Sequence, residues 1–88
     1  MPSVSSQLRL KVLFFGRVRE ITGFAEEIVE APQGATLADL FEQYAARFPK
    51  LLGFRASLVA SRNQEFAAWD TPLAADDEIA FLPPVSGG

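Results

Sequence analysis

The residues that could do chemistry in this chain are its last two, Gly87 and Gly88. Neither has a Cβ atom, so this end of the chain can enter a channel too narrow for any larger residue. A terminal carboxyl group ordinarily has a pKa of about 3.5, so at neutral pH it is ionised and a poor electrophile. We therefore expect the carboxylate of Gly88 to be the reacting group and to need activation before its oxygen can be replaced.

The rest of the chain lacks the side chains on which most catalysis depends. It has no cysteine and no histidine, which removes thiolate nucleophiles, iron–sulfur ligation and the usual zinc sites, as well as the commonest general base. Asp76, Asp77 and Glu78 offer too few oxygens for a coordination shell, so we interpret them as a solvated turn. We expect no metal, no cofactor and no catalysis by the chain alone.

Length, charge and hydropathy narrow the class of protein further. The 88 residues suffice for one domain. Their formal net charge of −3 argues against a nucleic-acid-binding protein, which needs a basic surface. The chain has no apolar run long enough to cross a bilayer, and its first residues lack the features of a signal peptide. We expect a cytoplasmic protein with neither a nucleic-acid nor a membrane partner.

The terminal glycines are positioned by a predicted strand over 78–82, which two prolines follow. Because proline cannot donate to a β-ladder, the chain should leave the sheet at this point as an extended arm. Six extended residues would reach about 20 Å. The predicted functional tail comprises Pro83, Pro84, Val85, Ser86, Gly87 and Gly88. A frayed end in which two glycines fell by chance is the simpler alternative.

The elements before the tail follow from hydrophobic periodicity. Alternation predicts a first strand over 8–15, on which Leu13 and Phe15 are apolar residues of the otherwise charged face. Thr36 and a stripe of apolar residues predict a helix over 37–48. The remaining expected segments are a helical turn at 18–22 closed by Gly23, an acidic edge strand at 24–31, an irregular stretch at 50–55, and strands at 56–61 and 65–67.

The order ββαβββ predicts an α+β fold of the β-grasp type, a mixed sheet packed on one long helix. Right-handed crossover would place the first and last strands side by side and parallel. We divide the chain into a flexible N-terminal tail (1–7), a β-grasp domain (8–82) and the C-terminal tail (83–88). The residues expected in the core are Leu10, Val12, Phe14, Leu37, Leu40, Phe41, Ile79 and Phe81.

Three motifs resemble the small, sulfur-carrying subunit of molybdopterin synthase. They are KVLFFGRVRE at 11–20, DTPL with DEIAF at 70–81, and PPVSGG at 83–88, and the similarity extends over 8–88. The chain departs from this family at Asp76, where the family usually has glycine, and aspartate adopts left-handed backbone angles less readily. The resemblance implies a ubiquitin-like carrier that is not an enzyme by itself.

The resemblance also implies a reaction cycle at Gly88. An E1-like enzyme adenylates the carboxylate, and a sulfur donor protein converts the adenylate into a thiocarboxylate. The tail then delivers the sulfur inside the large, catalytic subunit of a heterotetramer. The acceptor there is the cyclic pyranopterin monophosphate precursor, which becomes the dithiolene of molybdopterin.

Docking to these partners needs a surface. In the family, five matching positions lie at or near the partner interface: Phe15, Arg19, Phe66, Phe81 and Leu82. Strand parity places Phe15 and Leu82 on neighbouring strands of one exposed face, although it turns Phe81 inward. A contiguous apolar patch on a small protein usually marks an interface, whereas scattered exposed apolar residues are normal.

Other functions fit the same tail. A ubiquitin-like protein modifier would join Gly88 to lysines of other proteins. The sulfur carrier of thiamine biosynthesis is also similar, but that family is usually shorter and lacks the Phe-Phe and Pro-Pro pairs. The absence of cysteine excludes a β-grasp ferredoxin. A structural module with an inert tail is the simplest alternative.

Overall fold

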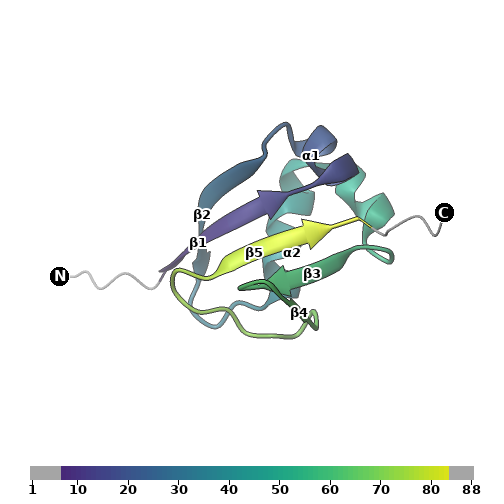
Figure 1. Ribbon diagram of the computed structural model, residues 1–88. Helices are drawn as coiled ribbons and strands as arrows, with labels where there is room; N and C mark the ends of the chain where they lie inside the picture. The colour runs from purple at the N-terminus through teal and green to yellow at the C-terminus, as the bar shows by residue number, and fades with distance from the viewer. Residues whose placement is uncertain (1–6, 84–88) are drawn as a thin grey trace.

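The computed structural model describes residues 7–83, which form a five-stranded sheet with α2 behind it (Figure 1). The elements are β1 (Gln7–Phe14), α1 (Gly16–Thr22), β2 (Glu26–Pro32), α2 (Leu37–Arg47), the 3₁₀-helix η1 (Pro49–Phe54), β3 (Val59–Arg62), β4 (Glu65–Ala67) and β5 (Glu78–Leu82). The strand order is β2-β1-β5-β3-β4. β1 and β5 pair in parallel at the centre and the other neighbours are antiparallel, which confirms the predicted β-grasp fold.

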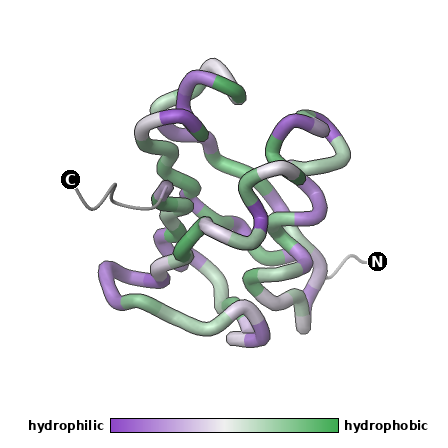
Figure 2. Tube along the Cα trace, turned by 90° about the vertical axis from the view of Figure 1, so that its right-hand side faces the viewer, coloured by the Kyte–Doolittle hydropathy of each residue, from purple (hydrophilic) through white to green (hydrophobic). Residues whose placement is uncertain are grey.

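The core lies between the sheet and α2, and the predicted core residues are all buried, with exposed fractions of 0–1%. In β1 the inward and outward positions alternate because successive side chains of a strand point to opposite faces. Figure 2 shows hydrophobic and hydrophilic residues interspersed along the trace, as such alternation requires. Each fully buried large apolar side chain contributes about 1.5–3 kcal/mol to folding.

Both helices begin or end as the sequence predicts. At the start of α2, Thr36 Oγ1 accepts a hydrogen bond from the Asp39 amide at 3.2 Å, and Asp39 Oδ2 accepts one from the Thr36 amide at 2.9 Å. This reciprocal capping box satisfies two amides that the helix leaves unpaired. At the end of α1, Gly23 has a φ of 83° and donates to the carbonyl of Arg19, a conformation that costs glycine little.

A polar cluster ties α2 to the edge strand β2. Tyr44 Oη donates a hydrogen bond to Glu27 Oε1 at 2.7 Å, and both terminal nitrogens of Arg47 donate to the same carboxylate. The hydrogen bond from Arg47 holds the pKa of Glu27 below its ordinary value, against the effect of burial. Burial raises the pKa of Tyr44. The cluster therefore fixes the helix to the sheet with an ionised carboxylate.

Some boundaries differ from the predicted ones. Most of the stretch 50–55, expected to be irregular, lies in η1, which ends at Phe54; Pro49 can begin a helix at a position whose amide has no partner to lose. β3 begins at Val59 rather than at residue 56, since the amide of Ser57 donates to the carbonyl of Phe54 in a turn. β1 begins at Gln7, inside the segment 1–7 that we expected to be a tail.

The solvated turn expected at 76–78 is wrong for Asp77, which is only 5% exposed. Its carboxylate accepts hydrogen bonds from Arg62 Nε at 2.6 Å, from Asn63 Nδ2 at 2.9 Å and from the amide of Ala74 at 2.8 Å. Burial raises the pKa of Asp77, but these hydrogen bonds outweigh it and hold the pKa below its ordinary value. Asp76 adopts the left-handed φ of 67° that glycine would favour.

Candidate functional site

The predicted tail begins at the end of the central strand β5. There Pro83 lies against the turn between β1 and α1, where Gly16 has a φ of 53°. A Cβ atom added to Gly16 would come within 2.9 Å of Pro83 Cγ, so the two residues pack closely. Pro84, Val85, Ser86, Gly87 and Gly88 lie outside the described residues, and their role stays a prediction.

A shallow depression of about 360 Å³ lies on the face of the sheet opposite α2, and it contains three of the predicted interface residues. Phe15 and Phe66 are 44% and 77% exposed, and Leu82 is half-buried beside them. The depression is lined by Leu13, Phe15, Ser61, Gln64, Phe66, Glu78, Ala80 and Leu82. The sheet thus brings together residues from both ends of the chain and from the β3–β4 hairpin.

The strand register explains the depression. Leu13 pairs with Ala80 across β1 and β5, and Ser61 pairs with Ala80 across β3 and β5. Ala80 and Ser61 are small residues, and they are only 8% and 7% exposed because larger neighbours surround them. Small side chains at the centre and exposed phenylalanines beside them make an apolar hollow that a partner's side chain can fill.

The other two predicted interface residues lie elsewhere. Arg19 is exposed on α1 and does not line the depression. Phe81 is 1% exposed, and its ring packs 5.8 Å from that of Phe41. The expected interface position of Phe81 is therefore corrected: β5 alternates, so Phe81 faces the core when Leu82 faces outward.

The strand parity that turns Leu82 outward also turns Ala80 outward, but sequence reasoning did not identify Ser61 or Gln64 as part of this surface. Small and polar residues carry no signal of their own. The register places Ser61 beside Phe66 and Ala80, whereas Gln64 lies in the turn between β3 and β4. Val59 is another residue of this face that we did not single out; it is 40% exposed and pairs with Leu82. A correct register for β3 and β5 would have identified Val59 and Ser61.

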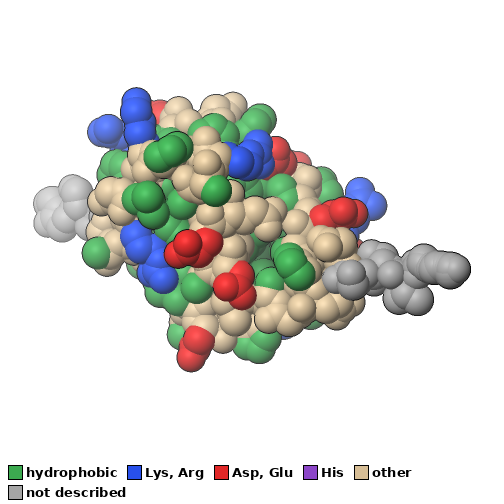
Figure 3. Space-filling view, turned by 180° about the vertical axis from the view of Figure 1, so that it is seen from behind, with side chains coloured by type: hydrophobic (Ala, Val, Ile, Leu, Met, Phe, Trp, Pro, Cys, Tyr) green, Lys and Arg blue, Asp and Glu red, His purple; other side chains and the backbone are tan. Residues whose placement is uncertain are grey.

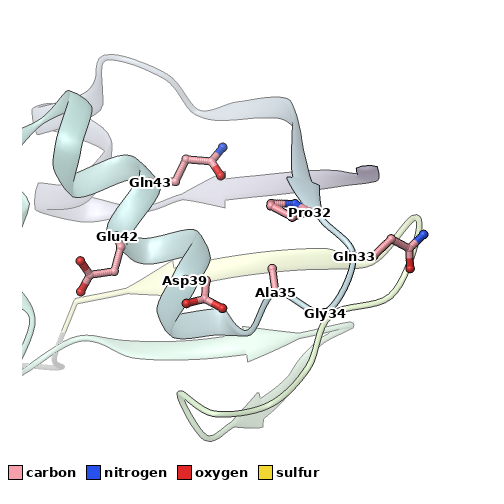
Figure 4. Close-up of a pocket in the computed structure, with 7 residues that line it drawn as sticks. All are labelled: Pro32, Gln33, Gly34, Ala35, Asp39, Glu42 and Gln43. Carbon is pink, nitrogen blue, oxygen red and sulfur yellow. The ribbon is translucent and has the colours of Figure 1, made fainter. Parts of the chain in front are cut away.

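A separate groove of about 430 Å³ lies between α2 and the loop that precedes it. Figure 4 shows Asp39, Glu42 and Gln43 on the helix beside this loop, with Gln33 pointing away from the helix. Pro32 pairs with Gln7 at the start of β1, whereas the tail leaves at the other end of the sheet. Since Asp39 is also part of the helix cap, this groove does not belong to the candidate site.

Within 7–83, no group of three or more histidine, cysteine, aspartate or glutamate side chains is placed to hold a metal ion. Within the same range, no helix has both the length and the apolar character needed to cross a membrane.

The fold and the site together define a ubiquitin-like β-grasp domain, whose central strand β5 ends beside an exposed apolar face. Comparison with known proteins gives the particular family. The model of the ThiS family matches residues 12–88, and the chain belongs to that family.

Similar proteins are known in detail. A molybdopterin synthase sulfur carrier subunit from Escherichia coli (strain K12) is 40% identical over 82 residues, which are 90% of this chain and 99% of that protein. The putative molybdopterin converting factor subunit 1 of Pyrococcus furiosus has a TM-score of 0.80 and 30% identity, over 89% of this chain and 99% of that one.

Two further structures have the same fold. SAMP1 of Haloferax volcanii, a small archaeal modifier protein, has a TM-score of 0.78 and 29% identity, over 91% of this chain and 99% of that one. A chain in the complex of subunits 1 and 2 of the molybdopterin-converting factor from Helicobacter pylori has a TM-score of 0.65 and 24% identity, over 92% and 100% of the two chains.

Proposed function

We propose that this chain is the sulfur-carrier subunit of a molybdopterin synthase. The observation that carries the proposal is the match to the sulfur carrier subunit of Escherichia coli over 99% of that protein's length. The geometry is consistent with this role, because the tail starts at the central strand and an exposed apolar depression lies beside its exit. A chain without cysteine or histidine suits a carrier whose chemistry is supplied by partners.

The reaction takes place at the carboxylate of Gly88. An E1-like enzyme transfers AMP from ATP to this carboxylate and releases pyrophosphate, which turns an ionised group into an electrophile. The terminal sulfur of a persulfide on the sulfur donor protein then attacks the acyl carbon and displaces AMP. A thiol of the donor next breaks the S–S bond, which releases the thiocarboxylate and leaves a disulfide on the donor. The large synthase subunit receives the tail and transfers the sulfur to the cyclic pyranopterin monophosphate precursor. Because ATP is needed, we place the cycle in the cytoplasm.

The outer face of the sheet docks the partners in this proposal. Phe15, Phe66 and Leu82 supply apolar area around the depression, and such exposed aromatic residues commonly carry much of the binding energy of an interface. Arg19, exposed on α1, lies at the edge of the contact. Two carriers and two large subunits would form a heterotetramer. Phe81 supports this surface from the core and does not contact the partner.

The test is the intact mass of the protein isolated from cells in which the pathway is active. A carrier caught between steps should exceed the sequence mass by the difference between one sulfur and one oxygen atom. The extra mass should map to Gly88 and disappear when the activating enzyme is deleted. A protein that never acquires this mass, although molybdopterin is being made, would contradict the proposal.

A ubiquitin-like modifier is the second candidate, and the similarity to SAMP1 favours it. In that case the activated carbonyl of Gly88 would be attacked by a lysine amine of another protein, with loss of AMP and formation of an isopeptide bond. Digestion of whole-cell protein should then yield lysines that carry remnants of the tail. The sulfur carrier of thiamine biosynthesis would be recognised by loss of thiamine, rather than of molybdopterin, on deletion.

A further inference from the structure

A second surface lies between α1 and η1, apart from the depression on the outer face of the sheet. It consists of two adjoining hollows of about 440 and 260 Å³, both lined by Ile21 and Lys50. Arg17, Glu20 and Phe54 complete the first hollow, and Arg47, Phe48 and Pro49 complete the second. Since Ile21 and Lys50 are common to both, the two hollows form one groove, which we call the α1–η1 groove.

Cations and aromatic rings form the walls of this groove. The guanidinium of Arg47 lies 5.2 Å from the ring centre of Phe48, and that of Arg17 lies 6.0 Å from the ring centre of Phe54. Contacts of this kind hold a guanidinium in place without neutralising it. The floor between them is the half-buried Ile21. The groove thus combines an apolar floor with positively charged walls.

Lys50 carries the charge that is left unpaired. Arg17 has Glu20 at 3.5 Å and Arg47 has Glu27 at 2.9 Å, so each arginine is partly neutralised. Among the described residues, 7–83, Lys50 has no acidic partner within ion-pair distance. An exposed lysine between two arginines therefore makes this groove positive, although the whole chain has a formal net charge of −3.

The groove lies at the end of the molecule where the tail begins. α1 starts at Gly16, against which Pro83 packs, and η1 contacts α1. Figure 3 shows Lys and Arg side chains gathered at the upper left of the helix side, the region of α1 and η1. A protein that encloses the tail would reach the outer face of the sheet on one side and this groove on the other.

We infer that the α1–η1 groove binds an acidic segment of the large synthase subunit. A carboxylate of that segment pairs with Lys50, and a neighbouring apolar side chain lies on Ile21 between the phenylalanine rings. Charge complementarity selects this occupant, because the three cations that line the groove outnumber Glu20, its acidic lining residue, and Lys50 is the cation without an acidic partner among the described residues. The inference rests on the proposed function, since it takes its partner from there.

The experiment measures the Kd between the full-length carrier and the large subunit encoded in the same genome. Lys50→Glu should raise the Kd about tenfold or more, because a like charge replaces the pair. Lys50→Ala should raise it less and should make the Kd less sensitive to salt than the wild-type Kd. The double variant Gln33→Glu/Ala75→Glu is the matched control: it makes the same change in net charge at two exposed residues that line neither the groove nor the depression, and the Kd should stay near the wild-type value.

The outcomes separate this inference from the proposed function. Equal losses for Lys50→Glu and the double control variant would show a net-charge effect and overturn the inference. A wild-type Kd for Lys50→Glu would also overturn it, while the proposed function would stand if Phe66→Arg still weakened binding. If the wild-type chain itself does not bind the large subunit, the proposed function fails as well. The melting temperatures should be equal, which excludes unfolding as a cause.

Discussion

Phe66 is 77% exposed on the short strand β4, and its ring lies at the edge of the depression. Phe66→Arg should leave the melting temperature within the usual range of surface variants, because little of the side chain is buried. Binding to the large subunit should weaken at least tenfold in a titration, since interface aromatics contribute about 2 kcal/mol or more. Ile28→Arg, 51% exposed on the edge strand β2 and outside the depression, is the matched control. Equal effects of the two variants would contradict the docking surface.

The two terminal glycines should both be required for sulfur transfer. Deleting Gly88 or adding a residue after it should abolish sulfur transfer in a reconstituted synthase assay. Gly87→Val should fail too, because the Cβ and its methyl groups block a channel that glycine passes. Thermal melting of these variants should match the wild type. Molybdopterin formation by the chain lacking Gly88 would refute the carrier mechanism.

Individual site residues could be predicted where their type contradicts the pattern around them. Phe15 and Leu13 are apolar on a face that Arg9 and Lys11 mark as exposed, and this conflict identified the surface. Ala80 creates no such conflict, because alanine occurs on both faces of a sheet. Its place in the depression depends on pairing with β1 and β3, which residue type alone does not encode.

At the scale of elements, α2 depends on its buried stripe. Leu40 is 0% exposed between the helix and the sheet, so Leu40→Ala should lower the free energy of unfolding by about 2–5 kcal/mol. Leu52→Ala in η1 makes the same deletion at a residue that is 58% exposed, and its effect should stay within about 0.5 kcal/mol. Urea unfolding measures both. Similar losses for the two variants would refute this packing.

The buried carboxylate in the turn before β5 should make the free energy of unfolding depend on pH. The folded-state pKa of Asp77 lies below its ordinary value, so its ionised form stabilises the fold above the ordinary value of 3.8. This contribution should be lost as pH falls through the lower, folded pKa. The free energy of unfolding, measured by urea titration, should therefore decrease as the pH is lowered below about 4.

Variants of Asp77 and Asp76 test whether the Asp77 carboxylate causes this pH dependence. Asp77→Asn should be less stable at pH 7, since Arg62 loses its anion, and its stability should change less with acid. Asp76→Asn, at the exposed neighbouring residue, should keep the wild-type dependence. A wild-type pH profile for Asp77→Asn would show that another group is responsible.

Elements with strong local signals were predicted well. The cap at Thr36 and the stripe of α2 are local, and so is the glycine that closes α1. η1 and the start of β3 were misassigned because a short 3₁₀ turn with local hydrogen bonds, such as that from Ser57 to Phe54, leaves no periodic hydrophobic pattern in the sequence. Asp77 was placed in solvent for a different reason: its partner Arg62 is fifteen residues away, on β3.

At the scale of the whole molecule, the sheet has two unequal faces. One is covered by α2, and the other carries the depression between exposed aromatic residues. The order of elements sufficed to predict this arrangement, because a parallel pair of terminal strands with a right-handed crossover leaves few topologies. The end of β5 and the α1–η1 groove lie at one end of the domain, which we propose is the end presented to a partner.

The central position of β5 has a consequence for how the protein is made. Among the described residues, β5 joins the β2–β1 pair to the β3–β4 pair, yet it is the last of these five strands to leave the ribosome. Until it is synthesised, the two hairpins have no common ladder and the core lacks Ile79 and Phe81. A chain that stops early therefore cannot reach the native state, and cellular proteases would remove it. Every carrier that folds has therefore been translated at least through β5, to the start of the proposed functional tail.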